Sequence, residues 1–173
     1  MQDILIVVDM QNDFISGSLG TEEAQKILPN VKRLIENFNG KVYYTRDTHY
    51  ENYLETKEGK NLPVEHCIKN TYGWEICDEL KNLKCDGIID KPTFGSLELV
   101  NMLLKDNDVE TINSITLCGL CTDICVISNA MLLKSAFLDS EIIVNSSCSA
   151  GVTPDSHNNA ISAMKMCQIK ILF

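Results

Sequence analysis

The residues best suited to covalent chemistry lie in the segment Cys118–Val126, which reads CGLCTDICV and follows the run Ile115–Leu117. This pattern predicts a strand that turns into a helix, with Thr122 as the N-cap residue and Cys125 in the first helical turn. Free backbone N–H groups and the positive end of the helix dipole favour a thiolate there. The same N–H groups could stabilise an oxyanion formed when the thiolate attacks a carbonyl carbon. The segment therefore predicts a nucleophile beside its own oxyanion site.

Other interpretations of these cysteines stay open from the sequence. Free cysteine is often a buried structural residue, and the chain contains eight cysteines. The spacing of Cys118 and Cys121 also fits a redox or zinc motif, but the chain has no second C-x-x-C pair, and Cys118 should lie inside the strand. The prediction of a nucleophile therefore concerns Cys125.

Two charged residues follow buried strands elsewhere in the chain. Asp9 ends the apolar run Ile4–Val8, and Lys91 comes just after the short run Gly87–Ile89. A charge next to a buried strand must be paired or take part in chemistry, because burying an unpaired charge is costly. A solvated lysine is the alternative for Lys91. Asp9 and Lys91 are therefore candidate partners of the thiol, and Lys91 would lower the pKa of that thiol.

A third group of residues has the composition of a metal site. Asp47 and His49 are two residues apart, so they would face the same way on extended backbone, and His66 lies in the same long polar loop. Carboxylate and imidazole are ligands of zinc, iron and manganese. The alternative is that Asp47 pairs with a neighbour and the histidines are ordinary loop residues. Two of only three histidines in the chain lie in this loop, which favours the metal site.

Composition narrows the class of protein. The 173 residues suit one domain, which we expect to span 1–173, and 45% of them are hydrophobic. The net charge is −9, with no basic cluster, so we expect no nucleic-acid binding. No apolar run approaches the length needed to cross a bilayer, so we expect no membrane association. The scattered cysteines favour reduced thiols and a cytoplasmic location.

The elements that must position these residues alternate between strand and helix. Strands are predicted at Ile4–Val8, Lys41–Thr45, Gly87–Ile89, Ile115–Leu117, Glu141–Val144 and Ile169–Leu172. Helices are predicted around Ile27–Phe38 with Pro29 near the first turn, at Gly73–Leu80, at Ser96–Leu104, from Thr122 to Phe137, and at Pro154–Met166. This order predicts an α/β fold: a six-stranded parallel sheet with helices on both faces.

The carboxyl ends of parallel strands meet at one edge of the sheet, where ligands of such folds bind. Asp9, Asp47, Lys91 and Cys125 all lie at such ends. Four independent residues at one edge are much less probable by chance than any one of them. We therefore expect a single active site there.

Five motifs, taken in chain order, resemble those of the isochorismatase-like cysteine hydrolases, the group that contains nicotinamidases. The motifs are Asp9–Phe14 (DMQNDF), Asp47–His49 (DTH), Leu62–Cys67 (LPVEHC), Lys91–Phe94 (KPTF) and Gly119–Val126 (GLCTDICV). The resemblance spans almost the whole chain. It implies a Rossmann-like fold, a catalytic triad of Asp9, Lys91 and Cys125, and the metal ligands Asp47, His49 and His66. It also implies a cis peptide bond between Leu120 and Cys121, with the N–H groups of Cys121 and Cys125 as the oxyanion hole.

The resemblance implies an amidohydrolase that converts nicotinamide to nicotinate and ammonia through a cysteine thioester. It also implies a divalent metal, with zinc expected and iron or manganese also compatible, and a homo-oligomer. True isochorismatases lack the nucleophilic cysteine, so Cys125 argues against that activity.

Two positions depart from the nicotinamidase pattern. A second loop histidine is absent, and Glu58, or alternatively Glu55, is the available replacement as a ligand. Leu62 stands where an aromatic residue is usual, so a wall for the substrate ring must come from elsewhere; Trp74 or Phe14 could supply it. Phe14 and Phe94 are the predicted substrate-binding residues, although both could be core aromatics.

Other functions stay possible. The protein could hydrolyse another small amide or a ureido compound, with the metal site vestigial. It could also be a non-catalytic binding domain, because a fold does not determine a function. The presence of the acid, the lysine and the cysteine together argues against a non-catalytic domain.

Overall fold

The computed structural model describes all residues, 1–173, and its centre is a six-stranded parallel sheet. Its strands are β1 (Gln2–Val8), β2 (Lys41–Asp47), β3 (Gly87–Lys91), β4 (Ile112–Leu120), β5 (Glu141–Ala150) and β6 (Lys170–Leu172). They lie in the order β3-β2-β1-β4-β5-β6, and every neighbouring pair is parallel. The predicted α/β fold is confirmed.

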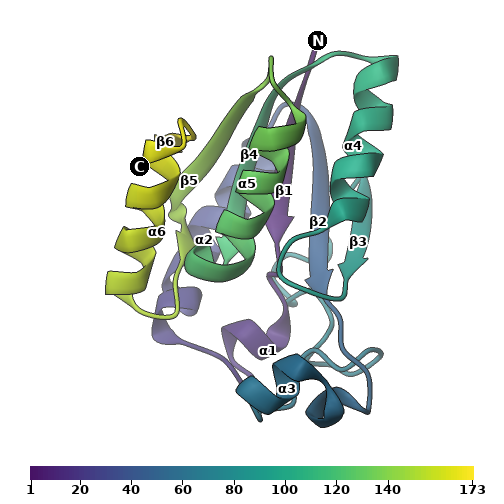
Figure 1. Cartoon of the computed structure of the whole chain (residues 1–173), viewed down its shortest axis with the longest axis vertical. Coiled ribbons are helices and arrows are strands. Elements are labelled where there is room, and N and C mark those ends of the chain that lie inside the picture. The colour runs from purple at the N-terminus through teal and green to yellow at the C-terminus, as the bar shows by residue number, and fades with distance from the viewer.

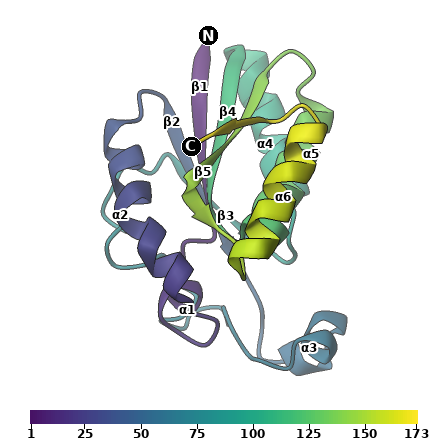
Figure 2. The ribbon, with the colours of Figure 1, turned by 90° about the vertical axis from the view of Figure 1, so that its left-hand side faces the viewer.

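Helices cover both faces of the sheet. They are α1 (Asn12–Ile15), α2 (Glu22–Asn37), α3 (Lys57–Asn61), α4 (Leu97–Val109), α5 (Ile127–Ala136) and α6 (Pro154–Met166). Figure 2 shows α2 on one side of the sheet and α4, α5 and α6 on the other. The structure contains no helix with the length and apolar character of a membrane span.

Strand β1 is buried on both faces, which explains its unbroken apolar sequence. Ile4, Ile6 and Val8 pack into the core under α4, α5 and α6. Leu5 and Val7 alternate with them and pack into the second core, under α2. The sheet order reverses between β1 and β4, so the carboxyl ends of these two strands form the switch point where ligands of α/β folds bind. In Figure 1 this end of the sheet faces α1 and α3.

The predicted helix at Gly73–Leu80 is wrong. Several backbone groups of this segment bond to residues 10–13 and not in a helical pattern: Asn12 N–H donates to Glu75 O, Asp13 N–H to Gly73 O, and Cys77 N–H to Met10 O. The apolar residues Ile76, Cys77 and Leu80 pack on the α2 face of the sheet from turns. Hydrogen bonds to a distant segment of the chain are therefore formed in place of the helix that the apolar spacing predicted.

The position of Pro29 is a second correction. Helix α2 begins at Glu22, because Thr21 caps it by accepting a hydrogen bond from Ala24 N–H at 3.0 Å. Pro29 therefore lies inside the helix and not in its first turn.

Candidate active site

The turn after β4 carries Cys125 to the switch point, and Gly119 makes that position possible. Gly119 pairs with Val8 across the β1–β4 contact and has a φ of +113°. A Cβ atom there would lie 2.1 Å from the Val8 carbonyl oxygen, so only glycine allows this approach of the strands. The peptide bond between Leu120 and Cys121 is cis, as expected.

Thr122 does not cap the helix in the predicted way. The chain passes through a π-helical turn, Thr122–Val126, before α5 begins, and the residue in the N-cap position is Cys121. The Thr122 hydroxyl instead lies 2.8 Å from His157 Nδ1, while His157 Nε2 lies 3.0 Å from Ser146 Oγ. His157 thus joins the turn to β5 and α6. A buried hydroxyl with an imidazole partner has no need to bond the backbone of its own turn.

The Cys121 N–H donates to no backbone or side-chain acceptor within the protein. It begins the turn whose fifth residue, Cys125, carries the thiol. A free donor at that position can take an oxyanion as its acceptor.

Asp9, Lys91 and Cys125 meet behind this turn. The Lys91 ammonium lies 2.6 Å from Asp9 Oδ2 and 3.4 Å from Cys125 Sγ. The Asp9 and Lys91 side chains are fully buried, and Cys125 is 5% exposed. Thr45 Oγ1 donates to the other Asp9 oxygen at 2.6 Å. The three residues predicted as a triad are therefore one contiguous group.

The electrostatics of the thiol differ from the sequence prediction. Burial raises the pKa of Cys125 well above its usual value; Asp9 raises it further, and Lys91 lowers it. Burial also raises the pKa of Asp9, against the opposing effect of Lys91. Lys91 acts in the predicted direction, but desolvation exceeds it. Burial therefore favours the neutral thiol, and a thiolate would form by passing its proton to a neighbouring base.

A cluster of four possible metal ligands lies next to this group. One ligand atom from each of Asp47, His49, Glu58 and His66 lies within 4.8 Å of the others. His49 Nε2 is 3.0 Å from Asp47 Oδ2 and 3.6 Å from Glu58 Oε1. Glu55 is exposed and outside the cluster, so of the two glutamates the geometry favours Glu58.

The orientation of His66 fits a metal ligand. Its Nδ1–H donates to the Val64 carbonyl at 2.8 Å, and its Nε2 faces the cluster, 3.6 Å from Asp47 Oδ2. A backbone acceptor on the far ring nitrogen is the usual support of a metal-bound histidine. The donor set of two imidazoles and two carboxylates suits a divalent transition metal.

Asp47 connects the cluster to the buried group. It pairs with Lys91 in the β2–β3 register, and the Lys91 ammonium lies 3.5 Å from Asp47 Oδ1. Burial opposes ionisation of Asp47, but hydrogen bonds from His49 and His66 and the charge of Lys91 outweigh it and lower its pKa. Asp47 is therefore a carboxylate, as a metal ligand must be.

Three polar residues that support the site were missed in the sequence. The buried Gln11 side chain accepts from Asp47 N–H at 2.7 Å and donates to Asp47 O at 2.9 Å. Asp13 accepts from Cys67 N–H at 2.8 Å, next to His66. Gln11 and Asp13 belong to the DMQNDF motif, in which Asp13 is of a residue type that is common in turns. The pairing of a side-chain amide with both backbone groups of another strand has no local sequence signal.

The third missed residue is Asn129. It is fully buried on α5 and donates to the carbonyls of Phe94 and Cys125 while accepting from Ser96 N–H. It therefore ties the loop after Lys91 to the turn that carries the thiol. Only its polar character within an apolar helix could have indicated this role.

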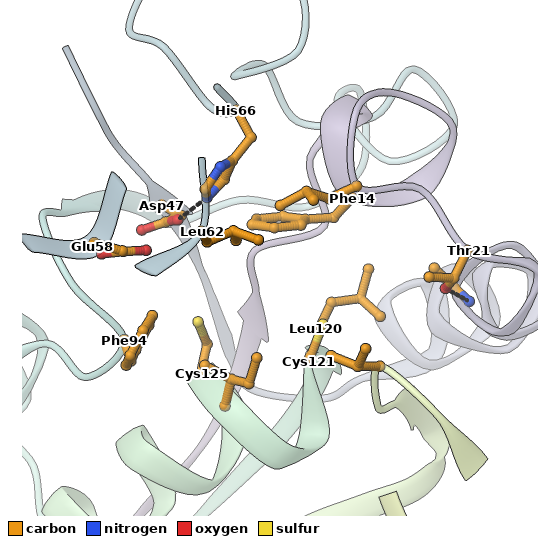
Figure 3. Close-up of a pocket in the computed structure, with 14 residues that line it drawn as sticks. Phe14, Thr21, Asp47, Glu58, Leu62, His66, Phe94, Leu120, Cys121 and Cys125 are labelled. Atoms are coloured by element: carbon orange, nitrogen blue, oxygen red, sulfur yellow. Dashed lines mark hydrogen bonds and ion pairs between the residues drawn. The ribbon is translucent and has the colours of Figure 1, made fainter. Parts of the chain in front are cut away.

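A pocket of about 280 Å³ opens over the thiol, the metal-ligand cluster and the carboxyl end of β4. Figure 3 shows Cys125 and the cluster residues Asp47, Glu58 and His66 around this cavity, with Thr21 at the far end. Phe14 and Phe94 both line it, as predicted from the sequence, and Leu62 lines it too. The size suits a small molecule.

Trp74 does not line the pocket. Its indole N–H donates to Thr48 Oγ1 at 2.9 Å, and the Arg46 guanidinium lies 3.5 Å from its ring centroid. These contacts hold the indole outside the pocket lining. Of the two aromatic residues considered as a wall for the substrate ring, only Phe14 therefore lines the pocket.

This arrangement has the parts of a covalent hydrolase. A thiol lies with a buried acid and an ammonium group, a free backbone N–H lies at the start of the same turn, and a pocket opens above them. Such groups can serve as a nucleophile, a proton acceptor, a fixed counter-charge and an oxyanion donor.

Known proteins share both the sequence and the fold. Residues 3–172 match the family described as isochorismatase domain. A nicotinamidase of Schizosaccharomyces pombe is 28% identical over 97% of this chain and 91% of its own. A pyrazinamidase of Pyrococcus horikoshii, solved in complex with zinc, is 29% identical over the whole of both chains, with a TM-score of 0.83. An N-carbamoylsarcosine amidase of Thermoplasma acidophilum is 28% identical over 99% of this chain and 96% of its own, with a TM-score of 0.80.

The match to the family covers nearly every residue, from the first strand to the last, and includes all of the side chains that meet at the switch point. The chain belongs to the isochorismatase domain family.

Proposed function

We propose that the protein is an amidase that hydrolyses nicotinamide to nicotinate and ammonia through a thioester at Cys125. The observation that carries this proposal is the contact of one buried ammonium, Lys91, with both Asp9 and Cys125 beneath a pocket of small-molecule size. The similarity to a nicotinamidase and a pyrazinamidase supports the choice of substrate.

In the first half of the proposed reaction Asp9 takes the proton of the Cys125 thiol, and the thiolate adds to the amide carbon. The N–H groups of Cys121 and Cys125 would stabilise the oxyanion, for which the free Cys121 donor is support. Asp9 then returns the proton to the departing nitrogen, the C–N bond breaks, and ammonia leaves the thioester.

In the second half Asp9 takes a proton from water, and the water oxygen attacks the thioester carbon. The C–S bond breaks, Asp9 returns its proton to the Cys125 sulfur, and nicotinic acid leaves and ionises to nicotinate. Lys91 supplies a positive charge that favours the ionised forms of Asp9 and Cys125 in turn.

The cluster Asp47, His49, Glu58 and His66 is the proposed site of the divalent metal, for which zinc is our first choice. Such an ion would offer a Lewis-acid contact for the substrate's ring nitrogen or for water. The zinc complex of the pyrazinamidase relative supports that choice, while the two carboxylates keep manganese or iron as candidates.

A second candidate function is hydrolysis of a ureido compound, and the similarity to an N-carbamoylsarcosine amidase is the observation that favours it. A purely binding role is disfavoured, because a buried group of three ionisable side chains is costly for a fold that gains no chemistry from it.

Ammonia release tests the proposal directly. Purified protein is assayed with nicotinamide, pyrazinamide and N-carbamoylsarcosine, with Cys125→Ala as the control. Nicotinamide turnover that disappears in the variant, together with a nicotinoyl adduct on Cys125 by mass spectrometry, is the expected result. Turnover of N-carbamoylsarcosine alone would favour the second function, and no turnover of any amide would overturn both.

The setting of the enzyme is also a proposal. We propose a cytoplasmic homo-oligomer, and the eight free cysteines support a reducing compartment. Light scattering on the purified protein tests the oligomeric state.

A further inference from the structure

The walls of the pocket carry no lysine and no arginine. Of its 14 lining side chains ten are hydrophobic, and the others are Thr21, Asp47, Glu58 and His66. Two of these four are carboxylic acids. A substrate with a negative charge on its body would therefore meet no lysine or arginine side chain in the pocket.

Lys91 does not change this conclusion, although it is close. Its ammonium is fully buried, lies 2.6 Å from Asp9 and 3.5 Å from Asp47, and donates to Thr93 O at 3.2 Å. It is not among the lining residues. An ammonium already shared by two carboxylates has little attraction left for a third.

A divalent ion in the cluster would not supply a free positive charge either. The two carboxylates Asp47 and Glu58 would balance its two charges, and His49 and His66 bind a metal as neutral imidazoles. The loaded cluster would be neutral overall. A ligand set with only one carboxylate would leave a net charge of about +1 and would attract an anion.

Outside the cluster the pocket lining is apolar except for Thr21. Leu19, Ala24, Ile124 and Val152 belong to this apolar lining together with Phe14. Its one hydroxyl, Thr21 Oγ1, already accepts from Ala24 N–H at 3.0 Å, although its proton can still be donated. A carboxylate placed against these apolar side chains would lose its water and find only the Thr21 hydroxyl as a polar side-chain partner, which is unfavourable.

We propose that the site selects amides with an uncharged, mainly apolar body and rejects amides that carry a carboxylate on that body. This inference rests on the proposed amidase function and narrows its substrate class. It also distinguishes the substrates of the two kinds of relative, because nicotinamide is neutral, whereas N-carbamoylsarcosine is an anion at neutral pH.

A pair of ligands that differ in charge and little in shape tests the proposal. Binding of N-carbamoylsarcosine and of N-isobutyl-N-methylurea, in which two methyl groups replace the carboxylate oxygens, is measured by calorimetry on Cys125→Ala protein loaded with zinc. We expect the neutral urea to bind tighter by about tenfold or more. Equal or tighter binding of the anion, or binding of neither compound, would overturn the proposal.

The same titration with nicotinamide, and ammonia release by the wild-type protein, keep the two proposals distinguishable. If nicotinamide is not cleaved, the amidase function fails, while the urea pair still measures the selection by charge. If nicotinamide is cleaved but the anion binds as well as the neutral urea, only the charge selection fails.

A cation added to the apolar lining should weaken the preference for the neutral urea. Leu19→Lys is compared with Leu19→Met, which adds length without charge. We expect the lysine variant alone to shift the ratio of the two dissociation constants toward the anion by about tenfold. Val152→Lys and Val152→Met repeat the test at a 49% exposed position, where a lysine is compatible with folding. If both lysine variants match their methionine controls, the proposal is wrong.

Discussion

The Lys91 ammonium and the Asp9 carboxylate face each other at 2.6 Å, and neither side chain has any exposed surface. Breaking such a buried pair leaves one uncompensated charge, whereas removing both is less damaging. The same ammonium also touches Cys125 at 3.4 Å. Chemistry and stability at this site therefore depend on the same contacts.

Asp9 and Cys125 should act as one unit. Asp9→Asn and Cys125→Ala are each expected to lower kcat by about a thousandfold or more, and the double variant should be no worse than the weaker single variant. The reason is that a base without its thiol has no proton to take. Steady-state ammonia release measures all three proteins. Losses that multiply in the double variant would show independent roles.

Cys85 and Cys167 should react first with a general alkylating reagent, because both are exposed, whereas Cys125 is buried and burial raises its pKa. The sequence pattern alone favours Cys125 as the first thiol to be alkylated. An aldehyde with the substrate's ring should instead mark Cys125, because the pocket places its carbonyl at the thiol. Peptide mapping after each treatment identifies which cysteines were modified. Modification of Cys121 by the aldehyde would contradict this assignment of the nucleophile.

Glu58→Gln should lower metal content, and Glu55→Gln should not. Only Glu58 places a carboxylate within 4.8 Å of the other three ligand atoms, whereas Glu55 is exposed outside the cluster. Elemental analysis after dialysis against a fixed zinc concentration measures the difference. Equal metal content in the two variants would remove Glu58 from the ligand set. Circular dichroism on both proteins serves as the folding control.

His157 should make stability depend on pH. Burial lowers the pKa of this histidine, so the folded chain takes up a proton less readily than the unfolded chain. Its contribution is then present above ~6.5 and is lost as the pH falls through the lower folded pKa. The difference in unfolding free energy between wild type and His157→Gln should therefore shrink from pH 7.5 to pH 5. A constant difference across that range would show that protonation of His157 is not linked to folding.

Gly119→Ala should destabilise the protein by about 2 kcal/mol or more, because the added Cβ would meet the Val8 carbonyl and the φ of +113° is unfavourable for alanine. Gly87→Ala is a suitable control, because its nearest contact would be 3.1 Å, to the side chain of Tyr43, and its φ is not in the positive region. Urea denaturation compares the two. A small effect at both positions would show that β1 and β4 can separate without loss.

The sheet could be predicted from the sequence because strands buried on both faces leave unbroken apolar runs. Ile4–Val8 is such a run, and the charge that follows it marks the edge where the site forms. The alternation of these runs with helical patterns was enough to predict that the strands are parallel. The spacing of apolar residues was therefore enough to predict the fold and to place the charged side chains at one edge of the sheet.

Features that depend on contacts between distant segments could not be predicted. The apolar spacing at Gly73–Leu80 suggested a helix, but the backbone of this segment bonds to residues near Met10 and Asn12. Threonine is a common N-cap residue, but the Thr122 hydroxyl is hydrogen-bonded to His157, 35 residues later in the chain. The preference of Cys125 for the neutral thiol follows from its burial, which the sequence alone does not measure.

Asp9, Gln11 and Asp13 each hold a different part of the site: Lys91, the backbone of Asp47, and the backbone next to His66. The loss or gain of a single residue in this segment would move these side chains out of register with all of their partners at once. In the long loop that supplies the metal ligands, exposed residues such as Glu51, Asn52 and Asn61 lie between the ligand positions. Among homologues we therefore expect the length of this first segment to be invariant, while insertions and deletions accumulate in the loop between His49 and His66.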